Sequence, residues 1–575
     1  MRLIFVAGGV MSGVGKGIAT ASIGKILKEY GFDVTAIKID PYINCDAGTL
    51  RPTEHGEVWV TDDGGEIDQD LGTYERFLEI DIPRMNNITT GQVYREIIER
   101  ERRGEYLGKT VQFIPHVPDE IRRRILEATR EHEIALIEIG GTVGDYENLP
   151  FLIAARNLRM ELGEKNVIFV LVTYLPVPKH IGEMKTKPTQ QAIRLLNETG
   201  IFPDFLICRS EYPIDDVRRK KIEFSSGIHQ DRIISAPDIE ITYEVPLKFE
   251  EENLGMKILE RFGIQPKHQA DWTRWKTLIN GIKNPKHRIK VAMVGKYVDI
   301  GDFYLPDSYI SINEALKHAG ANLNVGVKID WIDSKIYERD ESKLQELKKY
   351  DGIIVPGGFG TSGVEGKIKA IRFARENKIP YLGLCFGLQL AVVEFARHVC
   401  EMDAANTTEV NPKTPYPVID ILPTQREILQ KSLYGASMRL GAYAAVLKEE
   451  TKVLELYQKT RRLEKDRKRI ENLKKNEKER FRLGNIADEK YVVLERHRHR
   501  YEVNPKFIKN LETKGLIFSG YHSRDNGETL MEFIELSDHR YFVATQAHPE
   551  FKSRLNDPAP LFIGFVEAAL KRSNL

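Results

Sequence analysis

The chain has 575 residues, enough for two to four domains, because a single hydrophobic core stops growing at roughly 250 to 300 residues. Lysine and arginine number 85 and aspartate and glutamate 84, so no excess of positive charge favours a nucleic-acid-binding protein. No apolar run approaches the roughly 18 residues of a membrane span. The four cysteines lie far apart without CxxC spacing, so they indicate neither a zinc site nor a disulfide framework and favour a reducing cytoplasmic setting: Cys45, Cys208, Cys385 and Cys400.

Short apolar runs alternate with amphipathic stretches in both halves of the chain. In the first half the runs read LIFVAGG, DVTAIKID, IALIEIGG, VIFVLVTY and FLICRS, which predicts a parallel sheet flanked by helices. The pattern restarts at RIKVAMVGKY, after a loop-like segment at 269–287. We therefore expect an α/β protein with two doubly wound parallel-sheet domains, at residues 1–268 and 288–575, joined by a linker at 269–287.

One charged segment, at about 448–485, belongs to neither pattern. It reads KEETKVLELYQKTRRLEKDRKRIENLKKNEKERFRLGN, without proline and with a single glycine near its end. Such a composition is typical of a solvated helical hairpin or a partly disordered insertion. A basic docking surface is the alternative.

The first apolar run leads into a glycine-rich loop, VAGGVMSGVGKG, at residues 6–17. A loop between a buried strand and a helix directs backbone N–H groups and a helix N-terminus at an anion, and Lys16 could reach the outer phosphates of a nucleotide. The loop departs from the usual phosphate-binding pattern, because Val10 replaces its first glycine and Gly17 replaces the hydroxyl residue that binds magnesium. A glycine-rich turn without a ligand is the alternative.

Acidic residues elsewhere in the first half could supply the missing magnesium ligand. Glu138 ends the strand IALIEIGG, at the sheet edge where α/β proteins bind ligands. The stretch EIDQDLG offers Glu66, Asp68 and Asp70, and one or two carboxylates suffice for a magnesium ion that also binds phosphates. Asp68 could instead be a turn-forming residue.

A second basic loop, KTKPTQQAI at 185–193, precedes a predicted helix. It places two lysines and two hydroxyls beside a proline that interrupts regular structure. Lysine binds phosphate as a point charge, so the loop suits a second anion. A solvated basic loop explains the same residues equally well.

The second half contains the parts of a cysteine nucleophile. PYLGLCFGLQ carries a strand into the elbow Gly-Leu-Cys385-Phe-Gly and then into a helix, whose N-terminus favours a thiolate. The loop VPGGFG at 355–360 could donate a second backbone N–H to an oxyanion. TQAHPEF supplies His548 as a base and Glu550, two residues on, as the acid that orients it. A lone buried cysteine or histidine is usually a packing residue, but these parts together favour nucleophilic catalysis.

These motifs resemble the CTP synthase family over nearly the whole chain. GGVMSGVGKG, KIDPYINCDAGT, DQDLGTYERF, EIGGTVGDYE, KTKPTQ and CRSEY are similar to its amidoligase domain. PGGFG, GLCFGLQ and AHPEF are similar to class I glutamine amidotransferase domains, and RHRHRYEVN is a further marker. The resemblance implies a ligase that aminates UTP to CTP with ATP, through a 4-phosphorylated UTP. Ammonia would come from glutamine hydrolysis at Cys385, His548 and Glu550 and pass internally to the synthetase site.

The resemblance also implies GTP as an activator, CTP as a feedback inhibitor and a homotetramer. By position it assigns ATP binding to Ser12, Gly13, Val14, Gly15, Lys16, Gly17, Lys38, Asp70 and Asp238. Mg²⁺, bound with ATP, would be held by Asp70 and Glu138. UTP and CTP would contact Ser12, Asp145, Tyr146, Glu147, Lys185, Thr186, Lys187, Pro188, Thr189, Gln190 and Lys221. Glutamine would contact Gly358, Phe386, Gln389, Glu409 and Arg500, and His55 would lie at the mouth of the ammonia passage.

Two other functions stay open on the sequence. Another glutamine-dependent amidoligase, of the cobyrinate type, would share a related loop and a glutaminase-like domain. A filament-forming assembly protein without activity would share the whole fold. Two departures from the family pattern stand out: VMSGVG lacks a second serine, and the charged insertion after Leu447 is longer than expected.

Overall fold

The computed structural model describes residues 1–50, 56–295, 309–421, 438–487 and 489–574. Contacts divide the chain into two compact units, and each is α/β as predicted. Unit 1 comprises Met1–Thr49 and Ile67–Arg274, and unit 2 comprises Leu50–Glu66 and Trp275–Leu575. No helix in the described part of the chain has both the length and the apolar character needed to cross a bilayer.

Unit 1 is built on a seven-stranded sheet in which every pairing is parallel. In spatial order its strands are β5 (Asn87–Thr89), β2 (Val34–Asp40), β6 (Ile134–Ile139), β1 (Arg2–Gly8), β7 (Val167–Tyr174), β8 (Phe205–Ser210) and β9 (Ile233–Pro237). The central strands are buried along their length because helices cover both faces, which explains their continuous apolar runs.

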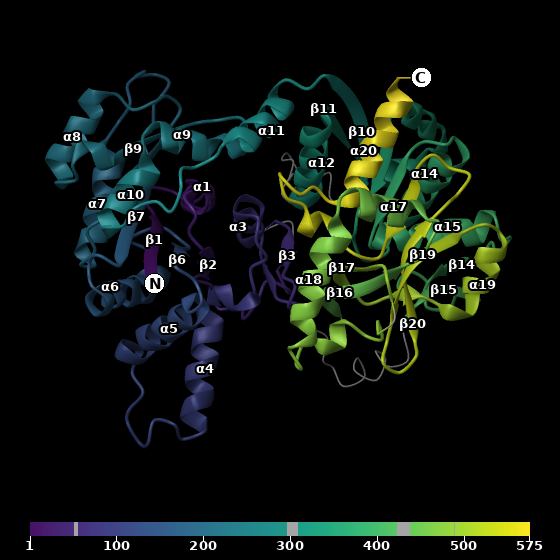
Figure 1. The fold of residues 1–575 in the computed structure, drawn as a ribbon, viewed down its shortest axis with the longest axis horizontal. Helices are drawn as coiled ribbons and strands as arrows, with labels where there is room; N and C mark the ends of the chain where they lie inside the picture. Colours follow the sequence, from purple (N-terminus) through teal and green to yellow (C-terminus); the bar gives the residue numbers. More distant parts are fainter. Residues whose placement is uncertain (51–55, 296–308, 422–437, 488, 575) are drawn as a thin grey trace. The chain divides into compact units, whose positions relative to one another are not determined.

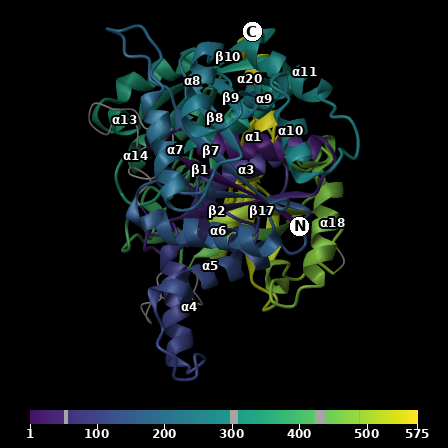
Figure 2. The same ribbon diagram turned by 90° about the vertical axis from the view of Figure 1, so that its left-hand side faces the viewer.

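The helices of unit 1 form two layers. They are α1 (Lys16–Glu29), α3 (Asp70–Leu78), α4 (Thr90–Arg102), α5 (Phe113–Thr129), α6 (Leu149–Leu162), α7 (Lys187–Glu198), α8 (Asp216–Ser226), α9 (Val245–Glu251) and α10 (Leu254–Phe262). Helix α1 packs against α3, α9 and α10, whereas α4, α5, α6 and α7 share a core with the opposite face of β1. The far end of α4 and the loop after it project away from this sheet (Figures 1 and 2).

Unit 2 contains a nine-stranded mixed sheet. Its strands are, in spatial order, β11 (Val325–Asp333), β10 (His287–Gly295), β12 (Gly352–Val355), β13 (Tyr381–Leu384), β21 (Phe542–Thr545), β20 (Thr529–Glu535), β19 (Ile517–Ser523), β16 (Arg439–Leu447) and β17 (Val492–His499). The strands from β11 to β21 are parallel, as predicted, and the remaining pairings are antiparallel. Smaller sheets pair β3 (Val58–Val60) with β4 (Glu66–Asp68), and β14 (Ala405–Thr407) with β15 (Tyr416–Asp420) and β18 (Glu502–Val503).

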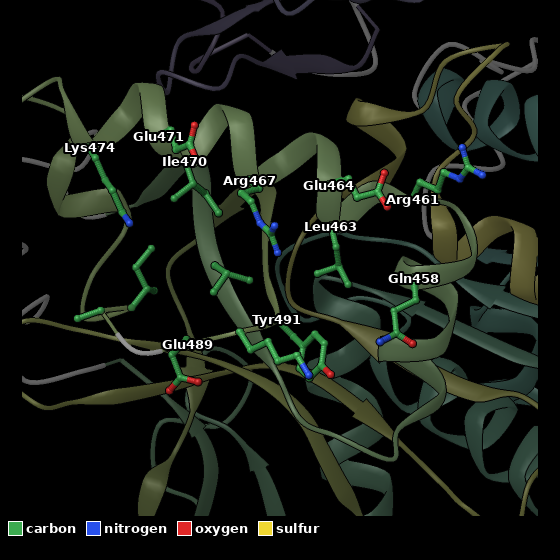
Figure 3. Close-up of a pocket in the computed structure, with 14 residues that line it drawn as sticks. Gln458, Arg461, Leu463, Glu464, Arg467, Ile470, Glu471, Lys474, Glu489 and Tyr491 are labelled. Atoms are coloured by element: carbon green, nitrogen blue, oxygen red, sulfur yellow. The ribbon is translucent and has the colours of Figure 1, made fainter.

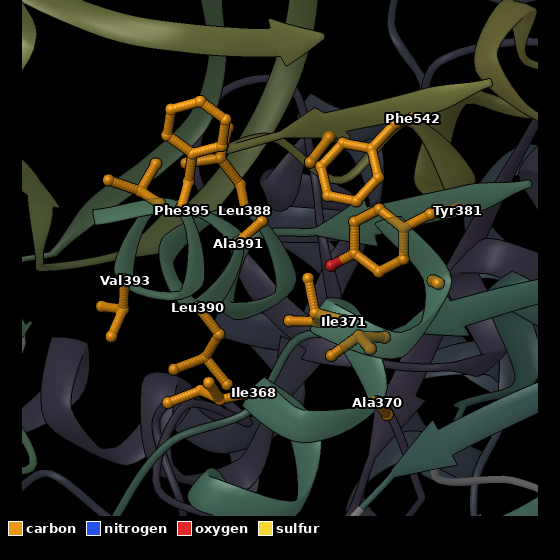
Figure 4. Close-up of a cluster of buried hydrophobic side chains, with 14 of the residues drawn as sticks. Ile368, Ala370, Ile371, Tyr381, Leu388, Leu390, Ala391, Val393, Phe395 and Phe542 are labelled. Atoms are coloured by element: carbon orange, nitrogen blue, oxygen red, sulfur yellow. The ribbon is translucent and has the colours of Figure 1, made fainter. Parts of the chain in front are cut away.

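The parallel part of this sheet is buried between helices. The helices of unit 2 are α11 (Thr273–Lys283), α12 (Ile310–Leu323), α13 (Lys335–Arg339), α14 (Val364–Glu376), α15 (Phe386–His398), α17 (Lys452–Lys459), α18 (Arg462–Lys474), α19 (Pro505–Thr513) and α20 (Pro560–Ser573). Figure 4 shows α14 and α15 contributing apolar side chains to a core beside Tyr381 and Phe542, whose rings stack 4.6 Å apart. This core fixes the strand that precedes Cys385.

The segment 269–287 is not a loop, which corrects one expectation. Helix α11 occupies most of it and buries Trp275, Leu278 and Ile279. This i, i+3, i+4 spacing is the signature of an amphipathic helix, and the polar residues between these positions conceal it. The division between the units falls beside the start of this helix, at Arg274, while the predicted domain boundaries stay a prediction.

The charged insertion forms the helices α17 and α18, but it is not simply solvated. Arg462 and Asp466 of α18 are buried as an ion pair, and Asp466 accepts a hydrogen bond from the Leu494 N–H at 2.9 Å. A groove of about 500 Å³ is lined by α18 on one side and by residues 486–487 and 489–492 on the other (Figure 3). Its rim carries Arg467, Lys474, Glu464 and Glu471, so charges of both signs surround it. The alternative of a basic docking surface stays a prediction.

Candidate active sites

The glycine-rich loop lies between β1 and α1 in unit 1, as predicted, and carries Ser12, Gly13 and Val14. Gly15 caps α1 in the left-handed conformation, with φ of 93°, which a side chain would strain. Lys16 folds back along the strand and donates to the Gly141 carbonyl at 2.9 Å. A Cβ atom on Gly8 would lie 2.7 Å from the Lys16 side chain, so Gly8 leaves room for this lysine.

A buried cluster of acids and one lysine lies at the carboxyl edge of the same sheet. Lys38 and Glu138 face each other on paired parallel strands, and the Lys38 Nζ lies 3.6 Å from Glu138 Oε1. The same ammonium pairs closely with Asp70 Oδ2, and the hydroxyl of Tyr74 donates to Glu138 Oε2. Burial raises the pKa of Glu138, and burial together with the charge of Asp70 raises the pKa of Asp68 to about 7.

The structure explains why the loop lacks a hydroxyl after its lysine. A Cβ atom on Gly17 would lie 3.1 Å from Asp70 Oδ1 and 3.6 Å from Glu138 Oε2. Each carboxylate therefore directs one oxygen at Lys38 and the other at the space beside Gly17. These hard oxygen donors fit Mg²⁺, which is usually held by one or two carboxylates together with substrate phosphates. Among the described residues, no group of three or more His, Cys, Asp and Glu side chains is arranged to hold a metal ion.

An apolar pocket adjoins the loop. It is lined by Gly15, Ile18, Ala19, Val172, Ile207, Arg209, Ala236, Pro237, Ile239, Val245, Lys248 and Phe249. Arg209 forms an ion pair with Asp238 at 2.5 Å, which places the predicted Asp238 at this pocket. Sequence reasoning missed Arg209, and the available signal was a charged residue at the end of the apolar strand FLICRS. The pocket measures about 20 Å³, so its apolar lining suits a nucleobase only if the surrounding side chains move apart.

The predicted second anion loop forms the N-terminal end of α7. Thr186 is the N-cap residue, Pro188 lies in the first turn, and Thr189 is buried with its hydroxyl donating to Tyr174 O at 3.2 Å. Gln190 donates to the Thr186 hydroxyl at 3.2 Å. Lys187 opens the helix, so this stretch offers a positive helix end together with lysine side chains.

The other predicted UTP residues lie on neighbouring turns of unit 1. Lys185 pairs with Glu183 at 2.7 Å, and the charge of Lys221 helps to lower the pKa of this glutamate after the larger effects of Lys185 and Arg218. In the loop after β6, Asp145 accepts from the Thr142 N–H at 2.7 Å. Tyr146 and Glu147 follow it in a short 3₁₀ helix with their side chains exposed.

Cys385 sits in the sharp turn that its flanking glycines predict. Its backbone has φ of 49° and ψ of −100°, a strained conformation that presents the side chain between β13 and α15. A Cβ atom on Gly387 would lie 2.2 Å from the Val355 carbonyl, and one on Gly383 would lie 2.6 Å from the Tyr381 hydroxyl. Both glycines are therefore required for close packing around the cysteine.

His548 and Glu550 lie beside this cysteine. The His548 Nδ1 is 2.7 Å from Glu550 Oε1, which orients the ring with its Nε2 free to face another group. Burial lowers the pKa of His548, but the negative charges of Glu550 and Cys385 outweigh burial and raise it to about 10. Such a histidine stays protonated near neutral pH and stabilises a neighbouring thiolate.

Backbone and side-chain groups for a substrate surround the cysteine. Phe386 is the first residue of α15, so its N–H points out of the helix N-terminus. Gly358 lies in the neighbouring loop, and a Cβ atom there would lie 3.5 Å from Lys367 Nζ. The same ammonium lies 5.4 Å from the centre of the Phe386 ring. Sequence reasoning missed Lys367, which looks like an ordinary surface lysine of an amphipathic helix but is only 1% exposed.

The predicted glutamine contacts gather on one side of the turn. The Gln389 side chain donates to Tyr501 O at 2.9 Å, and Glu409 accepts from the Gly360 N–H at 2.7 Å. Burial raises the pKa of Tyr501, with Glu409 adding to the rise and Arg500 opposing it, so both charges act at this tyrosine. His55 lies outside the described residues.

Comparison with known proteins places both halves in families. The family described as CTP synthase N-terminus matches residues 2–264, and the class-I glutamine amidotransferase family matches residues 304–568. A CTP synthase of Pyrococcus abyssi is 50% identical over 568 residues, which cover 99% of this chain and 98% of the relative. The chain belongs to the CTP synthase family. It is therefore a ligase of the class that uses glutamine as amide-nitrogen donor, and not a cobyrinate-type amidoligase.

Other CTP synthase sequences match as completely. The CTP synthase of Methanocaldococcus jannaschii is 48% identical over 575 residues, covering 99% of this chain and 98% of the relative. Among solved structures, the glutaminase domain of the Trypanosoma brucei CTPS with bound acivicin is 32% identical to this chain. That likeness covers 49% of this chain and 94% of the other, with a TM-score of 0.41.

Proposed function

We propose that this chain aminates UTP to CTP with ATP, using ammonia that it releases from glutamine at a Cys-His-Glu triad. The observation that carries the proposal is the buried bond between His548 and Glu550 beside the strained Cys385. The phosphate loop of unit 1, with its acid cluster, supports the ATP-dependent half of the reaction. Family membership supports UTP, ATP and glutamine as substrates.

In the glutaminase half, the Cys385 thiolate attacks the amide carbon of glutamine. Backbone N–H groups of Gly358 and Phe386 stabilise the oxyanion that forms. His548 donates its proton to the departing ammonia and then activates the water that hydrolyses the thioester. Glu550 holds the ring in place throughout, since its carboxylate binds Nδ1.

In the synthetase half, Lys16 binds the outer phosphates of ATP while the apolar pocket beside Arg209 receives the base. Asp70 and Glu138 would hold Mg²⁺, which neutralises phosphate charge when bound. Lys38 keeps both carboxylates in position. Transfer of the γ-phosphoryl group to O4 of UTP creates a phosphate leaving group, which ammonia then displaces at C4.

The remaining family properties belong to the same proposal. The UTP phosphates suit the lysines and the helix end at 185–190, together with Lys221. Residues 145–147 would serve UTP and the feedback inhibitor CTP. We also propose activation by GTP, a homotetramer and a cytoplasmic setting.

A turnover assay tests the two-site proposal. CTP formation is followed by absorbance with UTP, ATP and Mg²⁺, and with either glutamine or ammonium chloride as the nitrogen source. Cys385→Ala should abolish the glutamine-dependent reaction and keep the ammonia-dependent one, whereas Lys16→Ala should abolish both. Equal loss of both reactions in Cys385→Ala would contradict separate sites, and absence of CTP formation by the unaltered chain would contradict the proposal.

A further inference from the structure

Strand β17 carries the alternating sequence Arg496-His497-Arg498-His499 at the edge of the large sheet of unit 2. Successive side chains of a strand point to opposite faces, so the arginines and histidines separate. His497 faces Glu532 at 3.4 Å and His499 faces Glu502 at 2.7 Å. Arg496 pairs with Asp62 and Arg498 with Glu66, two residues that by their contacts belong to unit 2.

The outer edge of β17 contacts the candidate triad directly. The His548 N–H donates to the Arg496 carbonyl at 2.7 Å, and the Cys385 Sγ lies 3.9 Å from the Arg498 carbonyl. A shift of this strand therefore moves the backbone of His548.

Asp62 contacts two buried cations near His548: Arg496, whose carbonyl accepts the His548 N–H, and Lys552, which follows His548 by four residues. Its Oδ1 accepts from Arg496 Nε at 2.5 Å, and its Oδ2 lies 3.3 Å from Lys552 Nζ. Arg496 is fully buried and Lys552 is 1% exposed on its side chain. Buried cations are costly without a counter-charge, so both depend on this carboxylate for their positions. Consistently, the two cations hold the pKa of Asp62 well below its usual range against the effect of burial.

A stacked row of rings forms a second connection between the same segment and the triad. The His548 and Phe551 rings are nearly parallel, with centres 5.1 Å apart. Phe551 in turn packs against Trp59 at 5.0 Å, and the Arg496 guanidinium lies 5.3 Å from the Trp59 ring. Polar and aromatic contacts from one segment thus converge on the same histidine.

We propose that Asp62, supported by Trp59, is a positioning residue for His548, so that glutamine hydrolysis requires the segment Gly56–Glu66 to be seated on β17. This inference rests on the proposed glutaminase function. The segment Gly56–Glu66 also continues directly into the acid cluster along the chain. Strand β4 begins with Glu66, which pairs with Arg498 at 2.8 Å, and ends at Asp68 of that cluster. Two residues beyond Asp68 lies Asp70, the candidate magnesium ligand.

Asp62→Asn in the full chain tests the proposal, with Asp63→Asn as the matched control from the same turn. Asp63 is the next residue in this turn and accepts from the Thr61 hydroxyl at 2.6 Å. For Asp62→Asn we expect kcat for glutamine-dependent CTP formation to fall at least about tenfold, with KM for glutamine changed by less than about twofold. Ammonia-dependent formation should be retained, and Asp62→Glu should restore part of the glutamine reaction.

Other results would overturn the proposal. These are full glutamine-dependent activity in Asp62→Asn, a loss that appears mainly in KM, or an equal loss in Asp63→Asn. If Asp62→Asn does not fold, Glu66→Gln removes the pair with Arg498, whose side chain is less deeply buried than that of Arg496, and should give a smaller kcat effect of the same kind. Cys385→Ala in the same assay distinguishes failure of the proposed glutaminase function from failure of the Asp62 proposal. If Cys385→Ala keeps glutamine-dependent activity, the proposed function fails, whatever the result for Asp62→Asn.

Discussion

Restoring the hydroxyl that the phosphate loop lacks should damage the synthetase site. Gly17→Ser would place a Cβ atom 3.1 Å from Asp70 Oδ1 and 3.6 Å from Glu138 Oε2. The shorter contact is tighter than a methylene group and a carboxylate oxygen normally allow, so Asp70 must move. Its other oxygen is held by the buried Lys38, which limits that movement.

The expected cost follows from overpacking a buried site, which is about 1 to 3 kcal/mol. If the bound state bears this strain, ammonia-dependent kcat/KM for MgATP falls roughly tenfold to hundredfold, since each 1.4 kcal/mol corresponds to about tenfold. Gly17→Ala separates sterics from ligation, because alanine adds the same Cβ without the hydroxyl.

The assay is ammonia-dependent CTP formation with MgATP varied. Both variants should lose activity to a similar extent. As a control for unit 2, the rate at which iodoacetamide alkylates Cys385 in the full chain should be unchanged. Serine activity well above alanine activity would mean that a hydroxyl at this position ligates the metal after all. Unchanged activity in both variants would refute the packing argument.

Three further predictions follow from the buried groups. Glu550→Gln removes a charge that raises the pKa of His548 to about 10, so the imidazolium is lost at lower pH. The high-pH limb of glutamine-dependent kcat should therefore move down by at least about one unit, and kcat at pH 8 should fall about 10²- to 10⁴-fold; an unmoved limb in a pH-rate profile would contradict this. Lys38→Met removes the counter-charge of three carboxylates, Asp40, Asp70 and Glu138, and should lower the free energy of unfolding by about 3 to 5 kcal/mol. Urea titrations with and without Mg²⁺ should show part of that loss recovered by the ion, and no recovery would speak against a metal at these acids. Gly387→Ala brings a methyl group to 2.2 Å from the Val355 carbonyl, so thermal unfolding should shift downward by several degrees for a loss of about 1 to 3 kcal/mol. A variant with an unshifted midpoint would show that the turn relaxes freely.

The parts of the sites that the sequence predicts are those in which a short string of residues dictates the backbone. Gly383 and Gly387 flank Cys385 because no side chain fits at either position, so the pattern and the turn imply each other. The His548–Glu550 pair is likewise local, with a single residue between its members, but Glu550 lies in the 3₁₀ helix Pro549–Lys552 and not in the extended segment that the sequence suggests. The roles of these residues in catalysis stay predictions until the variants are assayed.

The parts that sequence reasoning misses depend on contacts between distant residues. Arg209 becomes a pocket residue through β8 and β9, and Lys367 approaches Phe386 only because α14 packs on α15. The segment Leu50–Glu66 interrupts unit 1 along the chain yet packs in unit 2, through Asp62 and Arg496 more than 400 residues apart. No local pattern encodes such pairings, because an aspartate in a turn has the same neighbouring sequence whether or not it pairs with a buried arginine elsewhere in the chain.

The charged insertion has a structural role that its composition conceals. An edge strand exposes backbone groups that must be satisfied or covered, and β17 is the edge strand that carries Arg496. Asp466 of α18 accepts its Leu494 N–H, and two residues further on the Arg496 carbonyl accepts the His548 N–H. The insertion and His548 thus contact successive outward-facing positions on one edge of one strand. The burial of Asp466 in so charged a segment is therefore explained by the strand that it covers, and the insertion supports the strand backbone that His548 contacts.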